Sequence, residues 1–140
     1  MFEKILLAVD GSEHALRAAT VAGDLARVVQ PNEFRVVVAY DPVPIYLGEP
    51  NLGQAIAARM HESQEIFEKA KEKVGKIAVE VDAELIEGPT AEAIVSVAAT
   101  RKSDLIVMGS RGLGRLAGAL LGSNSQKVLS HASCPVLIVR

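Results

Sequence analysis

The feature that most restricts the fold is an alternation of short apolar segments with longer segments of helical periodicity. The strand-like segments are Lys4–Val9, Arg35–Tyr40, Val81–Ile86, Leu105–Met108 and Pro135–Val139. Neighbouring parallel strands need long crossover connections, usually helices, and four helix-like segments lie between these strands. The sequence therefore predicts an α/β fold with one parallel sheet, and 140 residues is the size of one domain, residues 1–140.

The helix-like segments carry apolar residues at spacings of three and four. The first helix follows the turn at Asp10–Ser12, and the second follows a proline- and glycine-rich loop at 41–53. Thr90 is predicted to cap a third helix that ends near Thr100. A fourth helix is expected to begin near Ser123, because Ser123 and Gln126 have the spacing of a capping box.

A glycine-rich loop follows the strand at Leu105–Met108. Its glycines are Gly109, Gly112, Gly114, Gly118 and Gly122. Glycines allow close approach of the backbone, and a helix that begins after such a loop presents free N–H groups and a positive dipole end. The loop therefore predicts an anion site; the alternative is a flexible surface loop.

Two common phosphate-binding motifs do not fit this loop. A Walker A motif needs lysine and then serine or threonine after its last glycine, whereas Gly114 is followed by Arg115 and Leu116. Gly112, Gly114 and Ala117 match a loose dinucleotide fingerprint. That fingerprint belongs after the first strand with an acidic residue about twenty positions later, which is absent here.

A third pattern fits at all four positions: Gly109, two residues, Gly112, nine residues, then Gly122-Ser123. This pattern resembles the nucleotide-binding signature of the ATP-binding branch of the universal stress protein family. The Ala8–Ser12 turn and the chain length agree with it, so the resemblance covers the whole chain. It implies a doubly wound five-stranded sheet in the order 3-2-1-4-5, with helices on both faces.

In that order the first and fourth strands are neighbours, so Asp10 and the glycine loop are expected to face one crevice. Asp10 suits ribose hydroxyls, although it is equally suited to cap a helix. The resemblance implies ATP, or AMP or ADP, as the ligand, with Mg²⁺ possible alongside it. The nucleotide-binding residues that it implies are Ala8, Asp10, Tyr40, Met108, Gly109, Gly112, Gly122, Ser123 and Asn124.

The function that follows is an ATP-binding regulatory protein of the stress response. The alternative is a slow Mg²⁺-dependent ATP hydrolase or phosphotransferase that uses Asp10. Dedicated catalysis is not expected, since Ser110 and Ser125 lack an evident base and His131 with Cys134 supply only two metal ligands. A phosphorelay receiver is disfavoured, because its clustered acids and late lysine are missing.

The composition bears on nucleic-acid binding, membrane insertion and cellular location. The net charge of −2 gives no reason to expect nucleic-acid binding, and no apolar run reaches membrane-spanning length. The single Cys134 favours a reducing compartment, so the cytoplasm is expected. The resemblance implies a homodimer joined through the last strand, Val136–Val139.

Two further expectations concern the glycine loop. The segment 110–121, with its leucines, is expected to be mobile and to fold over the site or contact a partner. Valine at Gly109 or Gly122 is expected to abolish nucleotide binding and to leave the fold intact, because the side chain would occupy the phosphate position.

Overall fold

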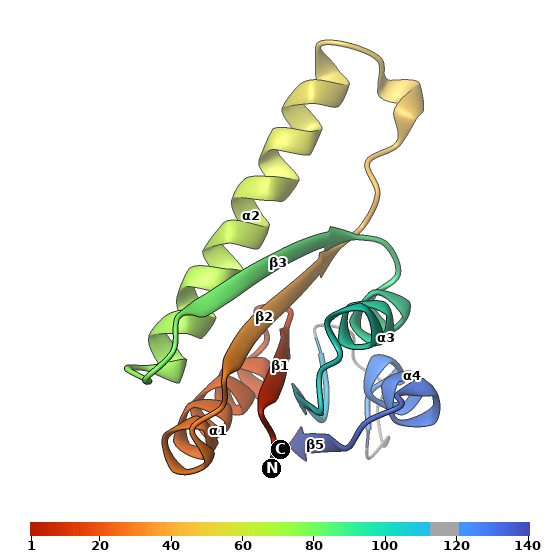
Figure 1. Cartoon of the computed structure of the whole chain (residues 1–140). Helices are drawn as coiled ribbons and strands as arrows, with labels where there is room; N and C mark the ends of the chain where they lie inside the picture. The colour runs from red at the N-terminus through yellow and green to blue at the C-terminus, as the bar shows by residue number, and fades with distance from the viewer. Residues whose placement is uncertain (113–120) are drawn as a thin grey trace.

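The sheet consists of five parallel strands, and the computed structural model describes residues 1–112 and 121–140 of the chain (Figure 1). The strands are β1 (Lys4–Val9), β2 (Glu33–Tyr40), β3 (Val81–Glu87), β4 (Leu105–Gly109) and β5 (Val136–Val139). Their order across the sheet is β3-β2-β1-β4-β5, which confirms the order that the family resemblance implies. β1 lies in the centre and pairs with both β2 and β4.

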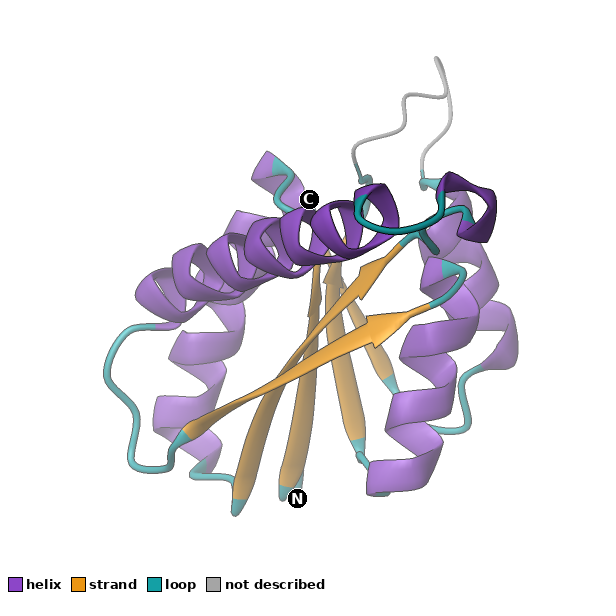
Figure 2. Ribbon diagram, turned by 90° about the horizontal axis from the view of Figure 1, so that it is seen from above, coloured by secondary structure: helices purple, strands orange, loops and turns teal. Residues whose placement is uncertain are grey.

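Helices cover both faces of the sheet (Figure 2). The helices are α1 (Glu13–Val29), α2 (Asn51–Val74), α3 (Thr90–Arg101) and α4 (Ser123–His131), with a short 3-10 helix, η1 (Ile45–Leu47). The helices α1 and α2 pack on one face and α3 and α4 on the other, so the described residues form two apolar layers. This arrangement explains why the central strands are continuous apolar runs.

Successive residues of β1 serve the two layers in turn. Ile5 and Leu7 belong to the layer under α1 and α2, whereas Leu6 and Ala8 belong to the layer under α3 and α4. All four are at most 5% exposed. β1 is therefore held by core packing on both sides up to its carboxyl end.

The predicted boundaries are close to those observed. β3 and β4 each extend one residue beyond the predicted end, and β5 begins at Val136 rather than at Pro135. β2 begins at Glu33, two residues before the predicted start at Arg35. The predicted loop at 41–53 contains η1, and α2 begins within it at Asn51. Figure 1 shows η1 and the first turns of α2 extending beyond the sheet.

Two predicted helix caps are wrong. Thr90 is the first residue of α3, and Pro89 occupies the N-cap position without a side-chain bond. Gly122 is the N-cap of α4, so Ser123 lies inside the helix and no capping box forms. Gln126 instead donates from Nε2 to the Leu121 carbonyl at 3.1 Å. Both segments place a residue without a hydroxyl immediately before the helix.

Candidate functional site

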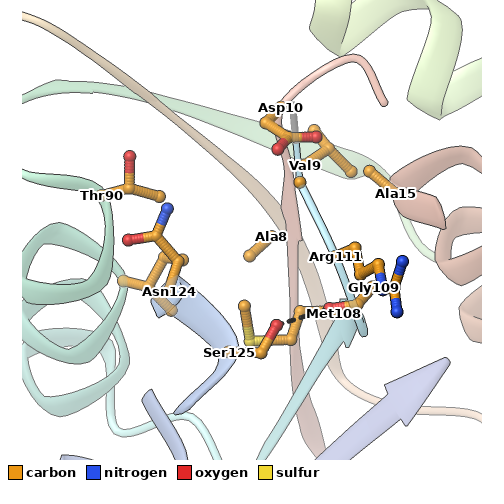
Figure 3. Close-up of a pocket in the computed structure, with 12 residues that line it drawn as sticks. Ala8, Val9, Asp10, Ala15, Thr90, Met108, Gly109, Arg111, Asn124 and Ser125 are labelled. Carbon is orange, nitrogen blue, oxygen red and sulfur yellow. Dashed lines mark hydrogen bonds between the residues drawn. The ribbon is translucent and has the colours of Figure 1, made fainter. Parts of the chain in front are cut away.

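A crevice lies at the carboxyl ends of β1 and β4, where the winding of the sheet reverses (Figure 3). Ligands of open α/β sheets bind at such a position. Residues from both central strands, their following turns and three helices line it: Ala8, Val9, Asp10, Ala15, Thr90, Ile94, Met108, Gly109, Arg111, Gly112, Asn124 and Ser125. Figure 3 shows Thr90 and Asn124 on one side of the crevice and Ala15 and Arg111 on the other.

The crevice brings together six of the nine residues predicted for the nucleotide. These six are Ala8, Asp10, Met108, Gly109, Gly112 and Asn124. Gly122 and Ser123 do not line it, although they immediately precede Asn124 at the start of α4. Tyr40 also lies outside the lining, and its carbonyl accepts a hydrogen bond from the Gly88 amide at 3.1 Å.

Asp10 shapes the turn between β1 and α1. Its Oδ1 accepts a hydrogen bond from the Ser12 amide at 3.0 Å. Ser12 is the N-cap of α1, and its Oγ accepts from the Ala15 amide at 3.2 Å. Gly11 between them has φ +85°, which favours glycine. The helix cap is therefore Ser12 rather than Asp10.

Asp10 also meets the glycine loop. A Cβ built on Gly112 would overlap Asp10 Oδ2, so the carboxylate lies directly against the Gly112 backbone. The two residues are separated by about a hundred positions in the sequence. Their contact means that the β1 and β4 turns share one crevice, as the expected strand order requires.

Gly109 has a packing role that the sequence did not reveal. A Cβ at this position would lie 2.8 Å from the His14 carbonyl carbon and 3.0 Å from the Ala15 amide nitrogen. These atoms are the backbone of α1, which must shift to admit any side chain. The expectation that Gly109→Val leaves the fold intact is therefore wrong.

Gly122 has tight surroundings as well. A Cβ there would lie 3.3 Å from Arg111 Cα and 3.5 Å from the Ser110 carbonyl oxygen. Its amide donates to that same carbonyl at 2.7 Å, which closes the two ends of the loop. A side chain at Gly122 would press on protein backbone.

Hydrogen bonds hold the start of α4 at the end of β4. Ser125 is 2% exposed, and its Oγ donates to the Gly109 carbonyl at 2.8 Å. The first turn of α4 lies beside the crevice, with the positive end of the helix dipole. Because no side chain caps this helix, the amides of its first turn are not bonded by a cap. α3 likewise begins at the crevice with Thr90 and has no side-chain cap.

The crevice is narrow in this conformation. The space open to the centre of a water molecule is about 30 Å³. A water needs about 10–15 Å³ by this measure, and small-molecule sites are commonly some 300 Å³ or more. The crevice in this conformation is therefore smaller than such sites commonly are. A larger hollow of about 270 Å³ lies between α3 and α4, but none of the predicted site residues lines it.

Some residues near the site were missed or misread from the sequence. Ser110 has a histidine partner after all, since its Oγ lies 3.0 Å from His14 Nδ1. Thr90 was assigned only a capping role, although it follows the turn after β3 and thus lies at the same edge of the sheet. Thr90 could have been predicted at the site, because residues that follow parallel strands gather at the same edge of the sheet. Nothing in the sequence indicated that His14 pairs with Ser110.

Residues 1–112 and 121–140 contain neither a metal-binding cluster nor a membrane-spanning helix. No group of three or more His, Cys, Asp or Glu side chains in these ranges is arranged to hold a metal ion. The His131 ring bonds through Nδ1 to the carbonyl of Lys127 in its own helix at 2.9 Å. None of the helices described is both long and apolar enough to cross a membrane. Of the leucines in the segment that was expected to fold over the site or contact a partner, those at 113, 116 and 120 lie outside the described residues, and only Leu121 lies within them.

Known proteins resemble the chain over its whole length. The sequence profile of the Universal stress protein family matches residues 1–140. A Thermus aquaticus protein, the universal stress protein in the QAH/OAS sulfhydrylase 3' region, is 48% identical over 140 residues, and the match covers 100% of both chains.

Solved structures share the fold. The universal stress protein UspA from Lactobacillus plantarum superposes with a TM-score of 0.85 at 25% identity, over 99% of this chain and 98% of that one. A universal stress protein solved in complex with cAMP superposes with a TM-score of 0.69 at 27% identity, over 99% of this chain and 97% of that one.

Proposed function

The chain belongs to the universal stress protein family, and from that premise we propose that it binds an adenine nucleotide in the crevice between β1 and β4. The observation that carries the proposal is the contact of the Asp10 carboxylate with Gly112, which brings the two predicted ligand-binding turns together. The relative solved with cAMP supports an adenine nucleotide as the ligand class. ATP is the ligand we propose, with ADP and AMP as relatives that share its adenosine.

Each part of the crevice suits one part of the nucleotide. Asp10 can accept hydrogen bonds from ribose hydroxyls, because the two oxygens of a carboxylate accept several hydrogen bonds at once. The first turn of α4, with Ser123 and Asn124, and the backbone at Gly112 offer N–H groups to phosphates. The Gly122 amide already donates to the Ser110 carbonyl, so Gly122 contributes close backbone approach rather than a donor. The glycine loop contains no lysine. Among the described residues that line the crevice, Arg111 carries the positive charge that could face the phosphates.

The remaining predicted residues have backbone or packing roles in this proposal. Ala8, Met108 and Gly109 form the floor at the strand ends. The Tyr40 carbonyl already accepts from Gly88, and its second lone pair is the proposed contact for the adenine edge. Because the crevice is narrow, the nucleotide is expected to displace the backbone at Arg111 and Gly112.

The proposed role is regulatory. A ligand that must displace part of its site binds two conformations with different affinity, and this difference is what allows it to change a surface or a partner contact. Mg²⁺ would accompany the phosphates. A homodimer through Val136–Val139 is part of the proposal, since among the described residues β5 is an edge strand paired with β4. A cytoplasmic location completes it.

The test is to release small molecules from freshly purified protein and identify them by mass spectrometry, followed by calorimetric titration with ATP and GTP. Recovery of an adenine nucleotide and selective binding of ATP are expected. Equal affinity for ATP and GTP, or no binding of either with Mg²⁺ present, would remove the proposal. Steady-state phosphate release tests the enzyme alternative, for which turnover of about 1 per second or more is typical of kinases.

A further inference from the structure

Ser110 joins three elements next to the crevice. Its amide donates to the Val139 carbonyl of β5 at 2.7 Å, and its carbonyl accepts from the Gly122 amide at 2.7 Å. Its Oγ lies 3.0 Å from Nδ1 of His14 in the first turn of α1. Ser110 is 3% exposed, so the hydroxyl depends on a protein partner rather than on solvent.

The chain on either side of Ser110 differs in its surroundings. Gly109 lies against the backbone of His14, with no room for a side chain. Arg111 and Gly112, immediately after Ser110, line the crevice. Ser110 therefore connects the packed position at Gly109 to the two residues that line the proposed nucleotide site.

We propose that His14 is a positioning residue for the nucleotide, acting through Ser110 to hold the Arg111–Gly112 backbone at the crevice. The inference rests on the proposed function and adds a residue to it. Neither His14 nor Ser110 lines the crevice, so the effect is indirect. The hydrogen bond fixes the Ser110 side chain, and the two backbone bonds of Ser110 then fix where the following residues leave β4.

The geometry makes a specific demand on the side chain at position 14. The bonding atom is Nδ1, which is one bond beyond Cγ. Asparagine places a polar atom at the same distance along the side chain, whereas glutamine places its polar atoms one bond further out. Asparagine should therefore replace His14 and glutamine should not.

The first experiment measures the dissociation constant for ATP in full-length variants, each verified as folded by circular dichroism. We expect His14→Ala and Ser110→Ala each to weaken binding about fivefold, the effect of losing one hydrogen bond. The double variant should lose about the same fivefold, because the two residues act through one bond. His14→Asn should restore affinity and His14→Gln should not. His61→Ala is the matched control, since His61 is exposed and pairs with Glu65 in α2.

The outcomes separate this inference from the proposed function. Wild-type affinity in the variants, multiplicative losses in the double variant, or rescue by glutamine as well as asparagine would overturn the positioning role alone. Failure of the wild-type chain to bind ATP would overturn the proposed function and this role with it.

The second experiment needs no nucleotide. Amide hydrogen exchange in the ligand-free protein should be about fivefold faster at Gly122 in His14→Ala than in wild type, because that amide bonds to the Ser110 carbonyl. Unchanged exchange at Gly122 would contradict the inference. His61→Ala should leave this amide unaffected.

Discussion

Gly23 of α1 lies directly against the carbonyl group of Val74, the last residue of α2. A Cβ built on Gly23 would overlap the Val74 carbonyl oxygen and lie 2.9 Å from its carbonyl carbon. One turn further along α1, Arg27 donates from Nη1 to the same oxygen at 2.9 Å and to the Lys76 carbonyl at 3.2 Å. The two helices thus meet backbone to backbone, and α1 supplies the donor that the end of α2 lacks.

The first prediction is that Gly23→Ala destabilises the protein. In an exposed helix interior the same change stabilises by up to about 1 kcal/mol. Here the added methyl must displace the end of α2, and overpacking of this kind costs about 1–3 kcal/mol. Urea unfolding measures the change.

Gly53→Ala in α2 is its control. A Cβ at Gly53 would meet only the end of the flexible Glu49 side chain, at 2.9 Å from Oε2. This variant should be neutral or stabilised. Equal stabilisation of both variants would show that α1 and α2 do not approach as closely as described.

The second prediction concerns the contact between Asp10 and Gly112. Gly112→Ala should reduce the free energy of unfolding by about 1–2 kcal/mol, because the new methyl overlaps the carboxylate. In an Asp10→Ala background the same substitution should cost less, since the obstructing oxygen is gone. A double-mutant cycle by urea unfolding gives the coupling between the two positions. Strictly additive effects would mean that the two turns are not in contact in solution.

The third prediction tests Asp10 as the ribose ligand. Asp10→Asn should weaken ATP binding by about tenfold or more, since hydrogen bonds to a charged group contribute about 1.5–3 kcal/mol. Asp41→Asn, at an exposed position in the loop after β2, should bind as wild type does.

Deoxy analogues of ATP test whether Asp10 binds the ribose hydroxyls. Removing the 2′- or 3′-hydroxyl of ATP should weaken binding to wild type but not further weaken binding to Asp10→Asn. If the deoxy analogues lose the same factor against both proteins, Asp10 does not bind those hydroxyls. Calorimetric titration provides each affinity.

The fourth prediction concerns Cys134. Burial raises the pKa of this thiol above its ordinary value, the charge of Asp104 raises it further, and a backbone hydrogen bond to Ile106 acts in the opposite direction. The folded protein should therefore react with iodoacetamide more slowly at about pH 8.5, the ordinary thiol pKa, than the same chain unfolded in urea. Equal rates would contradict the raised pKa.

The sign of the stability change follows from the same shift. Because the folded pKa is raised, the contribution of Cys134 is fully present below the unfolded pKa and is lost as pH rises through the folded pKa. Cys134→Ser should flatten that part of the stability curve above about pH 8.5. Urea unfolding across this alkaline range measures it, with wild type as the comparison.

The sequence was sufficient for the parts of the fold that depend on periodicity. The apolar run at Lys4–Val9 became β1 with the predicted bounds, because a strand buried on both faces has no polar alternation to blur its ends. The meeting of Asp10 and Gly112 did not follow from periodicity alone. It was predictable once the family resemblance supplied the strand order, since carboxyl ends of neighbouring parallel strands lie together.

Contacts between separate elements were not predictable in the same way. The close approach of Gly109 to α1 depends on how near a helix lies to a strand, and a single glycine gives no partner. The bond between His14 and Ser110 joins residues 96 positions apart, and neither has a neighbour in sequence that indicates the other. The hydrogen bond from the Gly88 amide to the Tyr40 carbonyl was not predictable either, because Gly88 follows a different strand.

The alternation of β1 between the two apolar layers has a consequence for how this gene can change. Deleting one residue within β1 would move every later side chain of the strand to the opposite face of the sheet. The side chains that now pack under α1 and α2 would then point toward α3 and α4. Asp10 would turn with them and lose its place beside Gly112. Selection acting on β1 can therefore accept exchanges of one apolar residue for another, but it must reject changes of length.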